Sequence, residues 1–179
     1  MNRSFSARPK PSNNNAKIAF GVALGIAAVG FLFYFLMERY RGIVGTAALF
    51  VLVTALLIYT KFISPSFVYD VIDDGSDVPL FVVRQIIGKR VTTLCRIELS
   101  EIVSVKHETR AERHAHKTPR DYKKYVYAPT MSPAENYRLT VINRYERAEI
   151  VIEISDELAE LLRETVKEAR AMKASEDEE

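Results

Sequence analysis

The three histidines are the residues of this chain best suited to hold a metal ion. His114 and His116 form an HxH pair in the stretch RAERHAHKTPRDYKK at 110–124, and His107 lies shortly before it. Two imidazoles at this spacing can clip one transition metal ion, but the stretch has no cysteine or well-placed carboxylate to complete a zinc set. A partly exposed polar loop accounts for the pair more simply, so we predict no metal and no cofactor.

The other residues with catalytic potential stand alone. Cys95 is the single cysteine, which excludes an internal disulfide, and its alternation with Ile97 and Leu99 is typical of a core strand rather than a nucleophile. Aspartates gather at 70–77, but their spacing is that of a turn and not of a calcium loop. The sequence contains no Gly-rich phosphate loop, GxSxG, HExxH or CxxC motif. We therefore predict that the chain is not an enzyme.

The stretch 110–124 is strongly basic, with six Lys and Arg residues and two acidic ones. Tyrosines interleave with Lys123 and Lys124, a mixture also found on surfaces that stack bases and bind phosphate. The same alternation is needed by a strand, and a net charge of +2 is unlike that of a nucleic-acid-binding domain. We predict no nucleic-acid binding. The interpretations left open are a surface facing anionic lipid, a solvated loop, and a loop that docks a protein.

Two uncharged apolar runs precede the polar part of the chain. IAFGVALGIAAVGFLFYFLM begins at residue 18 and GIVGTAALFVLVTALLIYT at residue 42. A helix of about 20 residues covers roughly 30 Å, the hydrocarbon thickness of a bilayer. We predict a transmembrane hairpin over 18–63, with spans at 18–37 and 42–61. The first run exceeds the roughly 7–15 residues of a signal-peptide core and lacks a small-x-small cleavage pattern, so we expect a retained anchor.

The charges that flank the spans predict their orientation. Residues 1–17 contain only basic charged side chains, and many more follow from Lys61 onward, while the turn between the spans carries Arg39 and Arg41 offset by Glu38. The positive-inside rule then places both termini in the cytoplasm, and we assign the protein to the plasma (inner) membrane. Residues 1–17 are polar and contain prolines, so we expect a disordered basic N-terminus.

Small residues mark one face of each span. They let helix backbones approach closely, so we expect the two faces to pack against each other within the hairpin. Pairing with another membrane protein, or no role beyond the usual abundance of Gly and Ala in spans, are the alternatives. Neither run contains an Asp, Glu, Lys, Arg or His residue, which argues against an ion or proton path through this chain. The proposed packing residues are Gly21, Gly25 and Ala28 on the first span, and Gly45, Ala48 and Ala55 on the second.

From Phe67 onward the apolar pattern changes to a period of two. Runs rich in β-branched and aromatic residues alternate with turn residues, which predicts seven strands and a hairpin turn at 143–146. Ser155 can then cap a helix that presents one apolar stripe, and the acidic tail 173–179 is expected to be disordered. The strands are predicted at 67–72, 80–87, 90–98, 102–108, 122–128, 137–143 and 147–154, and the helical stripe is Leu158, Leu161, Leu162, Val166 and Ala169.

Two stretches carry a resemblance to a known family. IGKRVTTLCRIELSEIVSV (87–105) looks like the second hairpin of bacterial pleckstrin-homology-like (PH-like) domains, and IVIEISDELAELLRE (150–164) looks like their last strand and closing helix. The chain thus resembles bacterial two-pass membrane proteins with a cytoplasmic PH-like domain, most of them uncharacterised. The resemblance implies an α+β chain: a two-helix transmembrane hairpin, then a seven-stranded PH-like antiparallel barrel at 64–172 closed by a C-terminal α-helix. The first hairpin loop, 73–77, is acidic, so phosphoinositide binding there is not supported.

The order of the strands predicts which connections face the membrane. If consecutive strands run antiparallel, the connection at 88–90 and the basic segment return to the end where the first strand leaves the bilayer, and the acidic loop at 73–77 lies at the far end. Each basic residue near an anionic leaflet contributes about 1 kcal/mol at best, so the patch orients the domain rather than attaching it. The predicted membrane-facing basic patch is Lys89, Arg90, Arg110, Arg113, Lys117, Arg120, Lys123 and Lys124.

These features predict a non-catalytic, membrane-anchored PH-like interaction or scaffold module. Its expected contacts are an unknown protein partner, the anionic inner leaflet, or both. The alternative is an accessory or regulatory subunit of a multi-chain membrane complex such as a transporter, with the helical hairpin as the docking surface. An unrecognised enzyme is a more distant alternative.

Overall fold

A computed structural model of the chain describes residues 4–9, 14–73, 78–130, 133 and 135–176. The chain divides into two compact units. A helical unit covers Pro11–Pro65 with Thr130–Ser132, and a β unit covers Met1–Lys10, Ser66–Pro129 and Pro133–Glu179.

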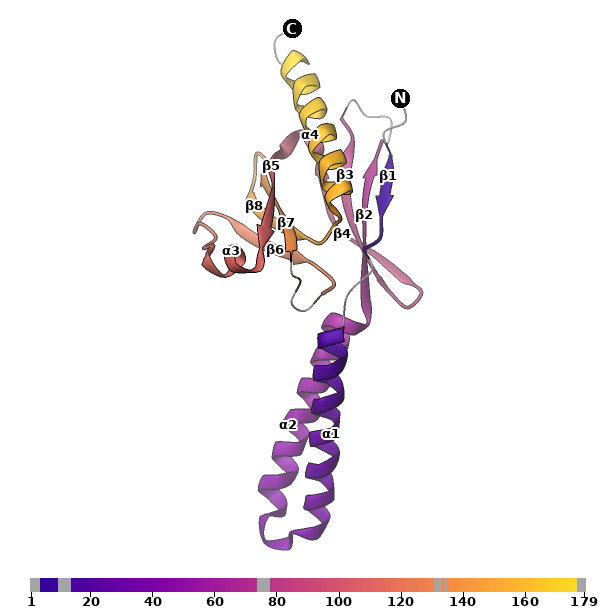
Figure 1. Cartoon of the computed structure of the whole chain (residues 1–179), viewed down its shortest axis with the longest axis vertical. Coiled ribbons are helices and arrows are strands. Elements are labelled where there is room, and N and C mark those ends of the chain that lie inside the picture. Colours follow the sequence, from indigo (N-terminus) through magenta and orange to yellow (C-terminus); the bar gives the residue numbers. More distant parts are fainter. Residues whose placement is uncertain (1–3, 10–13, 74–77, 131–132, 134, 177–179) are drawn as a thin grey trace. The chain divides into compact units, whose positions relative to one another are not determined.

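The helical unit is a hairpin of two helices that lie side by side (Figure 1). The described residues include two segments long and apolar enough to cross a membrane, Asn14–Leu36 and Glu38–Ile63. The predicted spans agree with these segments to within a few residues at each end. The unit consists of α1 (Asn14–Leu36), the short helix η1 (Glu38–Tyr40), α2 (Arg41–Ile58) and the π-helical turn η2 (Tyr59–Ile63).

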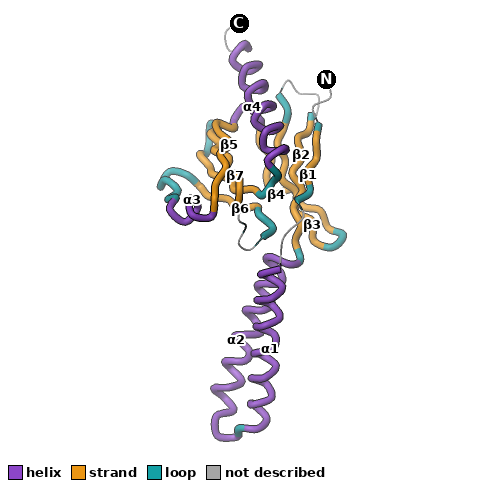
Figure 2. The backbone as a smooth tube through the Cα atoms, in the orientation of Figure 1, coloured by secondary structure: helices purple, strands orange, loops and turns teal. Residues whose placement is uncertain are grey.

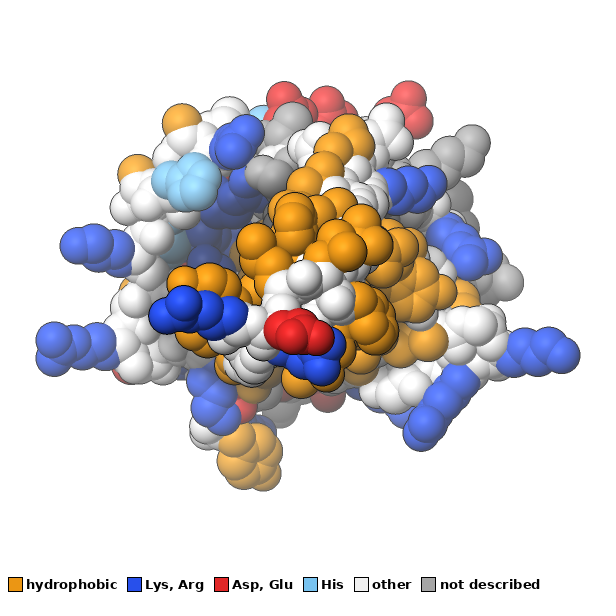
Figure 3. All heavy atoms as spheres, turned by 90° about the horizontal axis from the view of Figure 1, so that it is seen from below, with side chains coloured by type: hydrophobic (Ala, Val, Ile, Leu, Met, Phe, Trp, Pro, Cys, Tyr) orange, Lys and Arg blue, Asp and Glu red, His pale blue; other side chains and the backbone are white. Residues whose placement is uncertain are grey.

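Large apolar side chains cover the outside of this hairpin (orange in Figure 3). Phe35, Ile43 and Phe50 are among the exposed ones. A helix that is hydrophobic on all sides needs an apolar surrounding, and soluble monomers rarely expose so large a continuous apolar surface. The composition of both helices therefore suits lipid.

Sheet A of the β unit contains one strand that the sequence does not predict. Residues 1–17 are expected to be disordered, yet Phe5, Ser6 and Ala7 pair antiparallel with Val71, Asp70 and Tyr69. Ala7 is buried in the core and Phe5 packs against it. A strand of this length is too short to give a periodic signal. The sheet has the order β1 (Phe5–Ala7), β2 (Pro65–Ile72), β3 (Leu80–Ile87) and β4 (Arg90–Glu98).

Sheet B follows after a short 3₁₀ turn, η3 (Leu99–Glu101), and includes a parallel pair. Strands β5 and β8 both pair antiparallel with β7, whereas β6 pairs parallel with β8. Strands β5 and β6 therefore run in the same direction, and the expected all-antiparallel order is wrong at this point. The sheet has the order β5 (Ile102–Thr109), β7 (Glu135–Ile142), β8 (Arg147–Ile152) and β6 (Lys123–Tyr127).

The predicted seven-stranded closed barrel is corrected to two open sheets with eight strands. All seven predicted strands occur, and β1 is the addition. Figure 2 shows the strands in two groups, and the described strands form no pairing that joins the groups into a closed barrel. The α+β class and the C-terminal helix are as predicted.

The last helix, α4 (Asp156–Glu176), packs against the core. Its buried apolar positions are Ala159, Leu162, Val166 and Ala169, which recur at helical spacing. Leu161, part of the predicted stripe, is exposed instead because the buried face is centred on Leu162. The helix continues past the predicted end of the domain at 172, and residues 177–179 of the predicted tail lie outside the described residues.

The core of the β unit lies between the two sheets and α4. Tyr69 of β2 and Phe81 of β3 stack on the sheet A side, and Leu139 and Ile150 lie on the sheet B side. The Tyr69 hydroxyl donates to the Tyr127 carbonyl oxygen on β6, so the two sheets are also joined by a polar contact. Burial raises the pKa of Tyr69, which therefore remains a donor.

Candidate functional site

The basic segment is not a loop at one end of the domain. It leaves β5 beside the start of β7, where Thr109 pairs with Glu135, and it enters β6 beside the start of β8, where Lys123 pairs with Ala148. These are opposite ends of sheet B, because β7 and β8 are antiparallel. The prediction that the whole segment returns to one end is therefore wrong. That prediction assumes that consecutive strands alternate in direction, but β5 and β6 run in the same direction.

Three charged side chains are buried along the path of this segment. Arg138 of β7 donates from Nη2 to Glu108 Oε1 of β5, and from Nη1 to Glu149 Oε2 of β8 at 2.9 Å. The side chains of all three residues are less than one-tenth exposed. Burying charges is costly unless each is paired, so removing one member of such a cluster leaves an uncompensated charge.

The segment covers this ion-pair cluster with two of its own side chains. His116 Nε2 lies 2.9 Å from Glu149 Oε1, and the Thr118 hydroxyl donates to Glu149 Oε2 at 2.8 Å. Arg113 donates to the Pro133 carbonyl oxygen at 3.1 Å. His116 therefore has a structural partner, while His114 is exposed in the short helix α3 (Arg110–Ala115). The two members of the HxH pair thus have different surroundings.

A groove of about 450 Å³ lies over the ion-pair cluster, with Lys106, Glu112 and Thr140 on its walls. Two buried atoms next to it, Glu108 Oε2 and Arg138 Nε, have no hydrogen-bond partner among the described residues. One oxygen accepts and one N–H donates, so a single water molecule could serve both. The arrangement holds the segment in place, and it includes no nucleophile.

The end of the basic segment is neutralised by acidic neighbours. Lys123 Nζ lies 2.9 Å from Glu146 Oε2, and Arg147 Nη1 lies 2.8 Å from Asp121 Oδ2. The hydrogen bond between Lys123 and Glu146 raises the pKa of Lys123 and lowers the pKa of Glu146. Glu146 belongs to the predicted hairpin turn, where Asn143 N donates to the Glu146 carbonyl oxygen at 3.1 Å.

The other predicted cations of the segment divide between its two ends. Arg110 and Arg113 lie where it leaves β5, whereas Lys123 and Lys124 lie where it enters β6. Besides Arg113, which is half-buried, the segment's predicted patch residues are exposed: Arg110, Lys117, Arg120, Lys123 and Lys124.

Lys89 and Arg90 lie at the turn of the β3–β4 hairpin. Gly88 has φ +60°, a backbone conformation that residues with a side chain rarely adopt. A substitution at this turn position would therefore be strained. A register shift follows Val83, and beyond it the hairpin leaves the core. We call residues 84–94 the β3–β4 arm; it projects from the rest of the β unit (Figure 1).

The β3–β4 arm exposes large apolar side chains beside these two cations. Val91 is 56% exposed, Ile87 is 45% exposed, and Leu94 is exposed as well. A strand with water on both faces normally carries polar residues at such positions. The sequence does not predict this feature, because an arm and a core strand have the same β propensity. The sequence does contain one sign of the arm: directly beside Gly88 and Lys89, apolar residues occupy strand positions that face both sides of the hairpin.

The tip of the β3–β4 arm lies at the end of sheet A where β2 begins. Strands β2 and β3 are neighbours joined only by residues 73–79, so they run antiparallel. The opposite end of β4, at Glu98, shares a groove with Tyr145 of the β7–β8 turn. The arm and Tyr145 therefore lie at opposite ends of the β unit, separated by the nine residues of β4, or roughly 30 Å.

The remaining residues singled out in sheet A have structural partners. Asp70 is buried and accepts from Arg84 at 2.7 Å. The acidic loop residues 74–77 lie outside the described residues. Burial, with the nearby charge of Glu146, raises the pKa of Cys95 to about 11, which agrees with a core thiol rather than a nucleophile.

The small residues of the helical hairpin follow the prediction on α2 but not on α1. Ala48 and Ala55 are buried, and a Cβ at Gly45 would lie 2.8 Å from the Tyr34 ring. On α1 the packing residues are Ala27, which is buried, and Gly30, where a Cβ would lie 2.9 Å from Ala48 Cβ.

The predicted α1 face, Gly21, Gly25 and Ala28, is exposed, and nothing lies within 4 Å of a Cβ at either glycine. The GxxxG spacing identifies a close-packing face, but it does not say which helix covers that face. The predicted packing face of α1 is therefore wrong: the helix is rotated about its axis, so that another face of α1 contacts α2.

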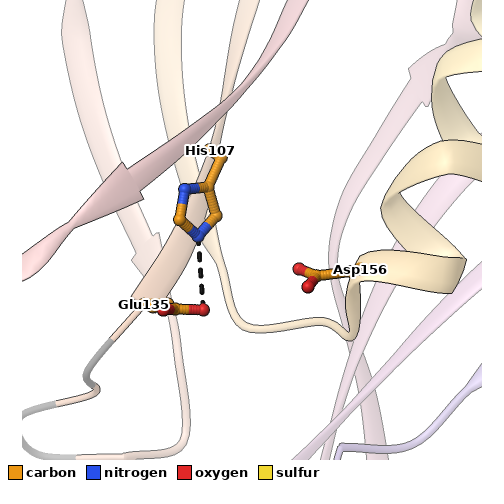
Figure 4. A group of neighbouring side chains, drawn as sticks. All are labelled: His107, Glu135 and Asp156. Carbon is orange, nitrogen blue, oxygen red and sulfur yellow. Dashed lines mark ion pairs between the residues drawn. The ribbon is translucent and has the colours of Figure 1, made fainter.

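Another group of side chains could hold a metal ion, and it does not include the HxH pair. His107 of β5, Glu135 of β7 and Asp156 of α4 each offer a ligand atom, and these atoms lie within 4.8 Å of one another (Figure 4). His107 Nε2 lies 3.3 Å from Glu135 Oε2. Tyr137 of β7 donates its hydroxyl proton to Asp156 Oδ1. The sequence gives no hint of this group, because its members are far apart along the chain.

The described residues thus include three places with distinctive chemistry: the covered ion-pair cluster, the β3–β4 arm and the His107 group. No family model matches the chain, and no curated protein matches it in sequence.

Proposed function

We propose that this chain is a two-pass plasma-membrane protein whose cytoplasmic β unit is a PH-like, non-catalytic interaction module. The β3–β4 arm rests on the anionic inner leaflet and orients the module for a protein partner. The observation that carries the proposal is the arm itself, which combines exposed Ile87 and Val91 with Lys89 and Arg90. Apolar side chains beside cations are the composition of membrane-interface segments.

Two observations support the two-pass topology. The described helices α1 and α2 are long and apolar enough to span a bilayer. In addition, β1 precedes α1 while its partner β2 follows α2, and the two strands are hydrogen-bonded neighbours. Paired strands must be on the same side of a membrane, which requires an even number of passes between them. The basic flanking residues favour the cytoplasmic side.

Chain connectivity supports contact between the arm and the leaflet. The π-helical turn η2 ends at Ile63 and β2 begins at Pro65. One intervening residue spans only a few ångströms, so the first residue of β2 is held at the bilayer surface if α2 crosses it. The arm's tip lies at this same end of sheet A.

The energetic scale of this contact is modest. Moving Ile87 and Val91 from water into the interface contributes about 1–2 kcal/mol each, and Lys89 and Arg90 add up to about 1 kcal/mol each. A few kcal/mol is enough to orient a domain that is already anchored. Because half of this energy or more is apolar, the contact should survive moderate salt better than a purely basic patch.

The PH-like assignment has partial support. The α+β composition and the C-terminal helix that packs against the core agree with the resemblance, whereas the closed seven-stranded barrel that it implies is replaced by two open sheets. The parallel β6–β8 pair and the crossover of the basic segment depart from a simple antiparallel order. The assignment therefore concerns the general architecture, and the lipid contact does not depend on it.

The test uses the absence of tryptophan in this chain. Val91→Trp in the full chain, reconstituted in vesicles with phosphatidylserine, supplies a single fluorophore on the arm. Brominated lipids quench a tryptophan that enters the interface. The matched control is Tyr145→Trp, at a position that is 95% exposed at the opposite end of the β unit.

We expect brominated lipid to quench the Val91→Trp variant strongly and the Tyr145→Trp variant hardly at all. Adding Lys89→Glu and Arg90→Glu to the Val91→Trp variant should reduce its quenching. Equal quenching of the two fluorophores, or none of the one on the arm, would refute leaflet contact by the arm.

The second candidate function, an accessory subunit of a membrane complex, is favoured by the uncovered α1 face. Gly21 and Gly25 do not pack within the hairpin. Gly25→Leu should therefore break assembly with a partner span and leave the hairpin intact, and deletion of the β unit should not prevent assembly. Crosslinking in intact membranes followed by mass spectrometry measures both effects. Unchanged crosslinks in Gly25→Leu would remove this candidate.

A further inference from the structure

The His107 group gathers metal-ligating side chains from three elements of the β unit. His107 comes from β5, Glu135 begins β7, and Asp156 begins α4 (Figure 4). We propose that these three side chains bind one first-row divalent transition metal ion of the zinc class. This site is independent of the lipid contact and of any enzymatic activity.

The donor set selects the class of ion. One imidazole nitrogen with two carboxylates suits Zn²⁺, Co²⁺ or Mn²⁺, whereas Ca²⁺ and Mg²⁺ prefer oxygen ligands only. Three protein ligands leave a fourth position for water, as in open zinc sites. All three residues are exposed, so an ion can enter without opening the core.

Tyr137 positions two of the three ligands. Its hydroxyl donates to Asp156 Oδ1, and its ring packs edge-on against the His107 ring with 5.2 Å between centroids. A hydrogen bond from a neighbour to a ligating carboxylate is the usual support of a metal site. Asp156 Oδ2 remains available for the ion.

The charges around the group also favour a cation. Among the described residues, neither Glu135 nor Asp156 has a Lys or Arg within 4.0 Å. Arg163 lies over the Tyr137 ring, but its guanidinium is engaged by Glu160 Oε1 at 2.7 Å and by the Val105 carbonyl oxygen at 3.1 Å. Two carboxylates close to each other with no such partner leave negative charge that a divalent ion neutralises.

The distances require only a small movement. The ligand atoms lie within 4.8 Å of one another, and His107 Nε2 is already 3.3 Å from Glu135 Oε2. Ligand atoms around tetrahedral zinc, at about 2.0–2.2 Å from the ion, are roughly 3.3 Å apart. Asp156 therefore needs to approach by about 1 Å or a little more, which side-chain rotation at an exposed position supplies.

The experiment titrates Co²⁺ into the full chain in nanodiscs, purified without a polyhistidine tag. Visible absorption reports nitrogen and oxygen coordination, and Zn²⁺ competition gives the affinity for zinc. We expect one equivalent bound. His107→Gln and Asp156→Asn should each weaken binding at least tenfold, and Tyr137→Phe should weaken it about 10–100-fold through the lost support of Asp156. The matched control is His114→Gln, an exposed histidine outside the group.

Each outcome decides the proposal. Asp156→Asn keeps an acceptor for Tyr137, and the side chain that accepts from the first turn of α4 is that of Ser155, so the effect of the substitution reports ligation rather than folding. Glu135→Gln, which lies at the exposed start of β7, gives a second variant with no buried contact to lose. The site is refuted if Co²⁺ gives no coordination spectrum, or if His107→Gln binds as tightly as His114→Gln.

Discussion

Arg138→Met tests whether the ion-pair cluster beneath the basic segment is buried in solution. Methionine fills most of the arginine's volume but carries no charge. Glu149 keeps two donors, His116 and Thr118, whereas Glu108 loses the one donor that the structure gives it. We therefore expect the variant to be strongly destabilised.

The magnitude follows from the burial. Removing one member of a buried ion pair costs about 3–5 kcal/mol, and an exposed pair is worth about 0–1 kcal/mol. The matched control is Arg147→Met, whose partner is Asp121 and whose side chains are both 56% exposed. Arg138→Met should thus consume a large part of the roughly 5–15 kcal/mol that stabilises a typical domain.

The assay is a urea titration of the full chain in detergent, followed by hydrogen exchange in peptides from β5 and β7. With a slope of about 1–3 kcal/mol per molar urea, the midpoint should fall by roughly 2 M for Arg138→Met and by less than about 0.5 M for Arg147→Met. Replacing Glu108, Arg138 and Glu149 together with Leu, Met and Leu should restore most of the loss, because no buried charge remains. Equal midpoints for the two single variants would refute the reasoning.

Two further predictions concern the core thiol and the helix contact. Because the pKa of Cys95 is raised from 9.0 to about 11, its thiolate is scarce at pH 8, and iodoacetamide should modify it roughly 100-fold more slowly than in the urea-unfolded chain, as measured by mass spectrometry. The folded state holds this proton to higher pH than the unfolded state, so the group should lower stability as pH rises from about 9 to 11, and a flat stability curve in that window would contradict the assignment. Gly30→Leu should destabilise the α1–α2 hairpin by about 1–3 kcal/mol in an SDS titration followed by circular dichroism, because its side chain meets Ala48, whereas Gly25→Leu should not; equal effects would contradict the observed helix contact.

The sequence predicts the elements of this chain better than their arrangement. Length and hydropathy locate the helices of the hairpin, and period-two patterning locates the seven strands that follow, to within about two residues. Neither hydropathy nor period-two patterning predicts whether two paired strands run parallel or antiparallel. The parallel β6–β8 pair therefore could not be foreseen, and the strand β1 is too short for any periodic test.

The candidate sites show the same limit. Basic residues and histidines at 110–124 stand out in the sequence, but burial assigns His116 and Arg113 to holding the segment on sheet B. The His107 group needs three strand and helix ends to meet, which depends on register. On the helical hairpin, Gly and Ala spacing identifies close-packing faces, and only the rotation of α1 shows which face is used.

Strand β1 has a consequence for how the protein is made. Its partner on β2 follows both apolar helices in the chain, so sheet A cannot be completed until the second helix has been synthesised. A chain whose second helix fails to insert leaves the outer edge of β2 unpaired, and unpaired edges invite aggregation. If the two helices span a bilayer, this three-residue strand can pair with β2 only when both helices are inserted, because only then do β1 and β2 lie on the same side.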